Sequence, residues 1–94
     1  MRLRWSARAR EDLKDIGRYI ARDDSRAARR WMEKLRLRAR QACDAPRSGR
    51  MVPELGRDDV RELLEGNYRI VYRIGASTVE IVLITEGHRR LVIE

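Results

Sequence analysis

Side chains suited to catalysis or metal binding are scarce in this sequence. Its 94 residues include one cysteine, one histidine and no phenylalanine. A lone cysteine cannot form an internal disulfide bond, and one Cys with one His is too few for a structural zinc site. Cys43 falls within a helical pattern as a small apolar side chain, so we predict a packing role for it. The sequence predicts neither a metal nor a cofactor.

Long apolar runs are also missing. The longest unbroken run of strongly apolar residues is 81–84, which is far too short to cross a bilayer. The N-terminal residues 1–5 alternate arginine with apolar side chains and contain no apolar signal core. We therefore expect a cytoplasmic protein without a membrane anchor.

No glycine-rich phosphate loop, Cys–His pair or internal repeat is present, and the length allows only one hydrophobic core. We predict a single domain over residues 1–94 that binds a macromolecule rather than a metabolite. The net charge of +7 is uneven: residues 1–50 carry 16 Lys and Arg against 7 Asp and Glu, while residues 51–94 carry 6 against 8. The basic half would attract an acidic protein segment or nucleic acid.

The first half of the chain has the pattern of a short strand followed by two helices. Residues 1–5 alternate as a half-buried strand does, and Ser6 can cap a helix over about residues 7–22. After a turn at residues 23–25, a second helix runs to Pro46. Its apolar positions are Ala28, Trp31, Met32, Leu35, Ala39 and Ala42. The short turn predicts an antiparallel helical hairpin.

The second half has strand patterns. Residues 46–59 contain two prolines and two glycines, which favours a long surface connection without a regular element. Gly66-Asn67 separates two strand-like segments, 61–65 and 68–74, and so predicts a β-hairpin. Residues 78–85 are rich in β-branched side chains, and 91–93 could form a last edge strand. We expect an α+β fold, with the helical hairpin packed on a mostly antiparallel sheet.

Strand alternation assigns side chains to the two faces of this sheet. We expect the helices to cover Tyr68, Ile70, Tyr72, Ile74, Val79, Ile81 and Leu83. The opposite face then presents Val71, Val82 and Ile84, which either the 46–59 segment or a partner protein must cover. Both alternatives are open from the sequence.

RNA cleavage by attack of a 2′-hydroxyl is the one catalytic reaction that these residues could support. It requires a base, an acid and cations, which Arg69, Arg73, His88 and Arg89 could provide. However, Arg69 and Arg73 also fit ordinary outward-facing strand positions. The arginines of the second helix fit a solvated outer face, and Trp5 and Trp31 fall on core stripes, so direct nucleic-acid binding is not predicted.

Four segments carry a resemblance to a known family, in matching order and spacing. They are Trp5-Ser6-x-x-Ala9-x-x-Asp12-Leu13-x-x-Ile16-x-x-Tyr19-Ile20, Gly49-Arg50-x-Val52-Pro53-Glu54-Leu55, Arg61-Glu62 and Gly66-x-Tyr68-Arg69-Ile70-Val71-Tyr72-Arg73. Over nearly the whole chain the sequence resembles the ParE branch of the ParE/RelE toxins. One departure is Glu86, near which the ParE pattern usually has a histidine.

The resemblance implies the toxin of a type II toxin–antitoxin pair, of the kind that stabilises plasmids, neutralised by an antitoxin with an acidic C-terminal segment. ParE-like toxins poison DNA gyrase by binding it. The gyrase surface that we expect is Arg73, His88, Arg89, Arg90, Leu91, Val92 and Ile93. The antitoxin surface that we expect is Val71, Val82, Ile84, Arg29 and Arg36.

The alternative that the resemblance leaves open is a RelE-like, ribosome-dependent mRNA endonuclease. In the RelE-like pattern a sheet arginine, an arginine in the last turn and a tyrosine just beyond it form the cleavage site. Arg69 and Arg89 match the two arginines, but no tyrosine follows Tyr72. His88 could substitute for it. The missing tyrosine favours the gyrase poison over the nuclease.

Overall fold

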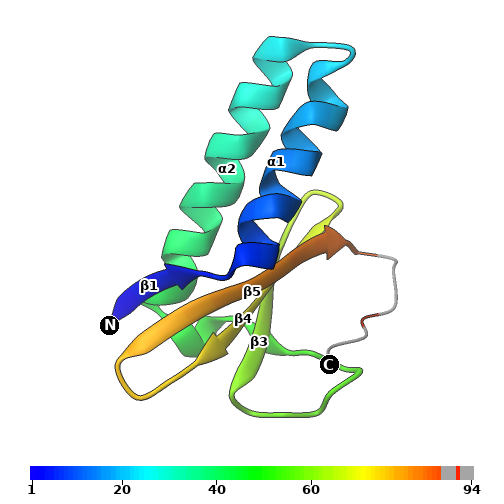
Figure 1. The fold of residues 1–94 in the computed structure, drawn as a ribbon. Coiled ribbons are helices and arrows are strands. Elements are labelled where there is room, and N and C mark those ends of the chain that lie inside the picture. Colours follow the sequence, from blue (N-terminus) through cyan, green and yellow to red (C-terminus); the bar gives the residue numbers. More distant parts are fainter. Residues whose placement is uncertain (88–90, 92–94) are drawn as a thin grey trace.

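A computed structural model gives the architecture, and it describes residues 1–87 and 91. The elements in chain order are β1 (Arg2–Trp5), α1 (Ala7–Ala21), α2 (Ser25–Asp44), the 3₁₀ helix η1 (Pro46–Ser48), β2 (Arg50–Met51), β3 (Val60–Glu65), β4 (Tyr68–Ile74) and β5 (Thr78–Glu86). The strands form a sheet in the order β1-β5-β4-β3-β2. Figure 1 shows α1 and α2 as an antiparallel pair beside the sheet. The predicted α+β fold is confirmed.

Both helix starts are capped by side chains. The Ser6 hydroxyl accepts a hydrogen bond from the Ala9 amide at 2.9 Å and donates to the Val82 carbonyl at 2.7 Å, so the cap also ties α1 to β5. Asp24, rather than Ser25, caps α2 by accepting from two backbone amides at its start. Gly17 of α1 leaves room for the Met32 side chain of α2, since an added Cβ would lie 2.5 Å from the Met32 sulfur.

The sheet is antiparallel except at one edge, where β1 pairs in parallel with β5. The predicted hairpin is formed by β3 and β4. Within the described residues, only glycines have a positive φ, and Gly66 is one of them, at 58°. Asn67, the second turn residue, therefore has a negative φ. A two-residue turn with a positive φ at its first position alone is of type II′.

The main core lies between the helices and the sheet. Leu35, on α2, is fully buried there. The other buried members are Ala9, Leu13, Ala39, Ala42, Cys43, Leu63, Ile70, Tyr72, Val79, Ile81 and Ile84. Cys43 packs among them, as predicted, and its thiol lies 3.3 Å from the Met1 carbonyl oxygen.

A β-bulge in β5 changes which side chains share a face. Val71 is opposite Leu83, but the next residue, Tyr72, is opposite Ile81, so Val82 is an extra residue without a partner in β4. Beyond the bulge the alternation is reversed. Ile84 therefore joins the helix-side core and Leu83 the opposite face, where the prediction from strict alternation had the two exchanged.

The segment 46–59 is more regular than predicted, because it contains η1 and β2. It also covers the face of the sheet that lies opposite the helices. Val52 is fully buried there with Val60, Val71, Leu83 and Leu91. The chain itself thus covers most of this face, which answers the question left open by the sequence.

The predicted last edge strand is not confirmed. Leu91 lies in no strand, and its side chain packs in the apolar cluster on the sheet face opposite the helices. Val92 and Ile93 lie outside the described residues.

Candidate functional site

A network of charged side chains lies on the sheet face covered by the 46–59 segment. Alternation along β3 and β4 places Glu62 and Arg69 on this face, with 1% and 4% of their surfaces exposed. The Arg69 guanidinium donates from Nε to Glu62 Oε1 at 2.9 Å and again from Nη2. It also donates from Nη1 and Nη2 to the two oxygens of Glu54, both at 2.9 Å. One cation therefore joins two carboxylates.

The network extends to two further segments. Glu62 Oε2 accepts a hydrogen bond from Arg50 Nε of β2 at 2.8 Å, and the ion pair also brings Arg50 Nη2 to 2.7 Å. Glu54 Oε2 accepts from the Leu91 amide at 3.0 Å. Hydrogen bonds from Arg69 and from this amide lower the pKa of Glu54 to about 2, and its two carboxylate partners raise the pKa of Arg69. Every charge in the network is therefore paired at neutral pH.

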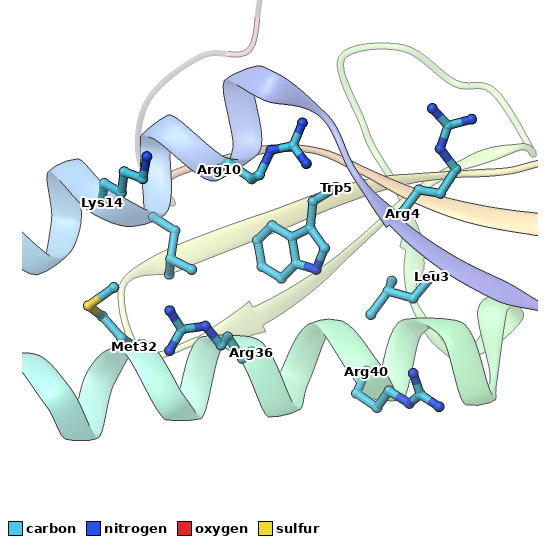
Figure 2. Close-up of a pocket in the computed structure, with 9 residues that line it drawn as sticks. Leu3, Arg4, Trp5, Arg10, Lys14, Met32, Arg36 and Arg40 are labelled. Atoms are coloured by element: carbon cyan, nitrogen blue, oxygen red, sulfur yellow. The ribbon is translucent and has the colours of Figure 1, made fainter.

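A second feature is a groove of about 670 Å³ between β1 and the two helices. Its apolar lining consists of Leu3, Trp5, Leu13 and Met32, and its charged lining of Arg4, Arg10, Lys14, Arg36 and Arg40. Figure 2 shows Trp5 between the helices, with Arg10 and Lys14 contributed by α1 and Arg36 and Arg40 by α2. None of the described residues that line this groove carries a carboxylate.

Helical spacing explains how the groove is built. Arg10, Leu13 and Lys14 lie on one side of α1, and Met32, Arg36 and Arg40 recur every four residues on α2. Within the described part of the chain, Arg40 is the one groove cation that makes an ion pair, and its distance to Asp44 is 3.9 Å. The positive charge of the groove is therefore little compensated, and the arrangement suits an amphipathic segment with acidic side chains.

Comparisons with known proteins agree with this fold over almost its full length. The family described as "ParE toxin of type II toxin-antitoxin system, parDE" matches residues 3–91. The chain belongs to the ParE toxin family. It is 36% identical over 92 residues to a Sinorhizobium fredii protein named "Putative toxin Y4kP", covering 95% of this chain and 91% of the relative.

A solved structure, "Chromosomal ParDE TA system from P. aeruginosa", matches with a TM-score of 0.76, covering 92% of this chain and 95% of the other. The identity of 21% makes this a likeness of fold. Because a ParE toxin is one half of a toxin–antitoxin system, membership implies an antitoxin as partner.

The structure of this ParE toxin changes the interpretation of the residues proposed for cleavage. Arg69 was expected to point outward, but it is buried and held by two carboxylates. Arg73 is exposed, as expected, and pairs with Glu80 at 3.1 Å. His88 and Arg89 lie outside the described residues. Thus the described residues bring no catalytic set together around Arg69.

The apolar residues predicted to bind the antitoxin do not form one exposed face. Val71 is fully buried under the 46–59 segment, Ile84 is 4% exposed on the helix side, and Val82 is partly buried. Arg29 and Arg36 are exposed on α2, as expected. Arg36 lies in the groove, whereas Arg29 lies outside it.

Sequence reasoning missed Arg4, Arg10, Lys14 and Arg40 as parts of one site, and it assigned Arg40 to a solvated helix face. The four-residue spacing of Met32, Arg36 and Arg40 could have indicated the α2 side of this site, because it places one apolar and two basic side chains in a row along the helix. Of the predicted gyrase-binding residues, Arg73 and Leu91 are described, and Leu91 is buried. Arg90, Val92 and Ile93 lie outside the described residues.

Residues 1–87 and 91 contain no group of three or more His, Cys, Asp or Glu side chains placed to hold a metal ion. Neither described helix combines the length and the apolar character needed to cross a membrane.

Proposed function

We propose that this ParE toxin inhibits DNA gyrase by binding it, and that it is not a nuclease. The observation that supports this is the environment of Arg69. In the nuclease alternative, this sheet arginine would stabilise the negative charge that develops on the phosphate during cleavage. Here its guanidinium is buried and makes hydrogen bonds to both Glu54 and Glu62. Moving a phosphate next to it would also bring the phosphate next to two carboxylates.

The gyrase-binding surface that we propose is formed by Arg73 and residues 88–93. Arg73 extends from β4, the second strand of the hairpin, and its side chain is 55% exposed. This surface remains a proposal from the family resemblance. Arg73 does not line the groove, so contact with gyrase and contact with an antitoxin can be tested by separate variants.

The test is a supercoiling assay with purified gyrase and relaxed plasmid, run beside an in vitro translation reaction in which mRNA cuts are mapped. We expect the toxin to inhibit supercoiling and to leave the mRNA intact. A variant truncated after Leu91 keeps the buried leucine and should inhibit gyrase much less. Cleaved mRNA with normal supercoiling would contradict the proposal and favour the nuclease.

We propose further that the groove between β1, α1 and α2 binds the antitoxin. Its support is the combination of an apolar floor at Trp5 and Met32 with five cations, and no carboxylate is present among the described lining residues. An amphipathic antitoxin segment could place apolar side chains on this floor and acidic ones against the cations. Such charge complementarity accelerates association as well as favouring the right partner.

The test is charge reversal of Arg36→Glu with Arg40→Glu, measured as antitoxin affinity by calorimetry. A matched control is Arg26→Glu with Arg30→Glu, because both positions are exposed on α2 but do not line the groove. We expect the groove variant to bind at least about tenfold more weakly, which corresponds to about 1.4 kcal/mol, and the control to bind normally. Equal losses in both variants would mean that only net charge matters.

A further inference from the structure

Leu91 is attached to the rest of the protein by two independent contacts. Its side chain is 7% exposed and packs with Val52, Val60 and Leu83. Its amide donates a hydrogen bond to Glu54 Oε2 at 3.0 Å. The chain is thus held at a defined point after β5, within the segment proposed to contact gyrase.

We infer that Glu54 is a positioning residue for the toxin: held by Arg69, it fixes the main chain at Leu91, a residue of the proposed target-binding surface. This inference rests on the proposed function, since it assigns a role in target binding. Glu54 itself would not touch the target. Its effect would be transmitted through the position of the Leu91 backbone.

The position of the Glu54 carboxylate is itself well determined. Two amides, those of Leu55 and Gly56, donate to the Val52 carbonyl at 3.1 and 3.0 Å, which closes a tight turn around residues 52–56. Gly56 allows this turn by adopting a φ of 61°. Because Val52 is fully buried at the start of the turn, Glu54 extends from an anchored segment.

Arg69 also fixes the orientation of the Glu54 carboxylate. Arg69 Nη1 and Nη2 each donate to one oxygen at 2.9 Å, a bidentate geometry that leaves the carboxylate one orientation. Oε2 then accepts from Leu91 as well as from Nη1. A glutamine at this position has a similar shape, but its amide nitrogen cannot accept. In one orientation of that amide the bond from Arg69 Nη2 is lost and Leu91 keeps only an uncharged, weaker acceptor; in the other, the bonds from both Leu91 and Arg69 Nη1 are lost.

Glu62 offers a control for the simpler idea that Glu54 only stabilises the fold. It binds the same Arg69 guanidinium and is more buried, with its side chain fully covered, while the Glu54 side chain is 20% exposed. Glu62 makes no hydrogen bond to Leu91. Loss of its charge should therefore cost at least as much stability as the same change at Glu54, without releasing Leu91.

The experiment compares Glu54→Gln and Glu62→Gln with Glu33→Gln, an exposed glutamate on α2. Three properties are measured on the full chain: the unfolding free energy, the toxin concentration that half-inhibits gyrase supercoiling, and hydrogen exchange at the Leu91 amide by NMR. We expect Glu54→Gln to raise the half-inhibitory concentration about tenfold, as losing a hydrogen bond to a charged group would predict. Only this variant should show faster exchange at Leu91, and Glu33→Gln should match the wild type.

The inference is overturned if Glu54→Gln and Glu62→Gln lose activity in proportion to their loss of stability, or if exchange at Leu91 is unchanged in Glu54→Gln. Failure of the proposed function looks different, because then the wild-type toxin itself does not inhibit gyrase. In that case growth inhibition on expression without antitoxin replaces the gyrase assay. The ranking of the three variants and the Leu91 exchange rates still decide whether Glu54 positions this segment.

Discussion

The two faces of the sheet are covered in different ways. On one face, two helices bury apolar side chains such as Leu35 and Ile70. On the other, the chain crosses the sheet as a loop and buries Arg69 and Glu62 beside a few apolar residues. The helix face depends on apolar packing, which tolerates exchange of similar side chains. The loop face depends on complete pairing of charges, so removal of one partner leaves another charge buried without compensation.

The largest effect should follow the loss of Arg69. Arg69→Ala leaves Glu54 and Glu62 without their shared cation, and we expect a destabilisation of about 3–5 kcal/mol. Urea unfolding followed by circular dichroism measures it. The double variant Arg69→Met with Glu62→Gln should recover part of the loss, because it removes one buried positive charge together with one buried negative charge. A cost below about 1 kcal/mol for Arg69→Ala would mean that the two faces do not differ in this way.

A slightly smaller effect is expected on the helix face. Leu35 is fully buried, so Leu35→Ala should destabilise the toxin by about 3 kcal/mol through lost burial and a residual cavity. Leu37→Ala, on the same helix but 61% exposed, is the matched control and should change stability by less than about 0.5 kcal/mol. Similar values for the two variants would show that α2 does not pack as described.

Tyr72 connects the two faces and should have an intermediate effect. Its ring lies in the helix-side core, while its hydroxyl donates to the Pro46 carbonyl at 2.6 Å and accepts from the Gly49 amide at 3.1 Å. Tyr72→Phe should cost about 1–2 kcal/mol in thermal or urea unfolding, because both backbone groups lose a partner. Tyr19→Phe, at a position that is 69% exposed, should have no measurable effect.

The smallest effect is a pH dependence that belongs to the loop face. The pKa of Glu54 is lowered from 4.5 to about 2 by Arg69 and the Leu91 amide. A carboxyl whose pKa is lower in the folded state stabilises the fold above its unfolded pKa, and this contribution is lost as the pH falls. The toxin should therefore lose stability between about pH 5 and pH 2. Glu54→Gln should lose less across the same range, and an identical slope would exclude Glu54 as a cause.

The helices and the hairpin could be predicted from the sequence because their signals are local. Ser6 marks the start of α1, and Gly66 marks the hairpin turn, whichever elements lie beyond them. The exchange of Leu83 and Ile84 could not be predicted, since a bulge arises from the pairing of two strands and leaves no clear mark in one of them.

The charged residues show the same limit. Arg69 alternates with apolar neighbours as a solvent-exposed residue would, and only the loop that carries Glu54 makes its position a buried one. The groove combines residues from three elements, so its cations come together only in the folded chain. Patterns within a segment therefore predicted the secondary structure, while contacts between distant segments determined both candidate sites.

The parallel pairing of β1 with β5 has a consequence for biosynthesis. Residues Arg2 and Trp5 pair with Thr78 and Ile81, near the opposite end of the chain. A nascent chain that has not yet reached β5 therefore leaves its first strand without a partner, and the helical hairpin without the strand that α1 packs against. Pairing between such distant segments is slow to form. The toxin can therefore complete its fold only after β5 has been synthesised and has left the ribosome.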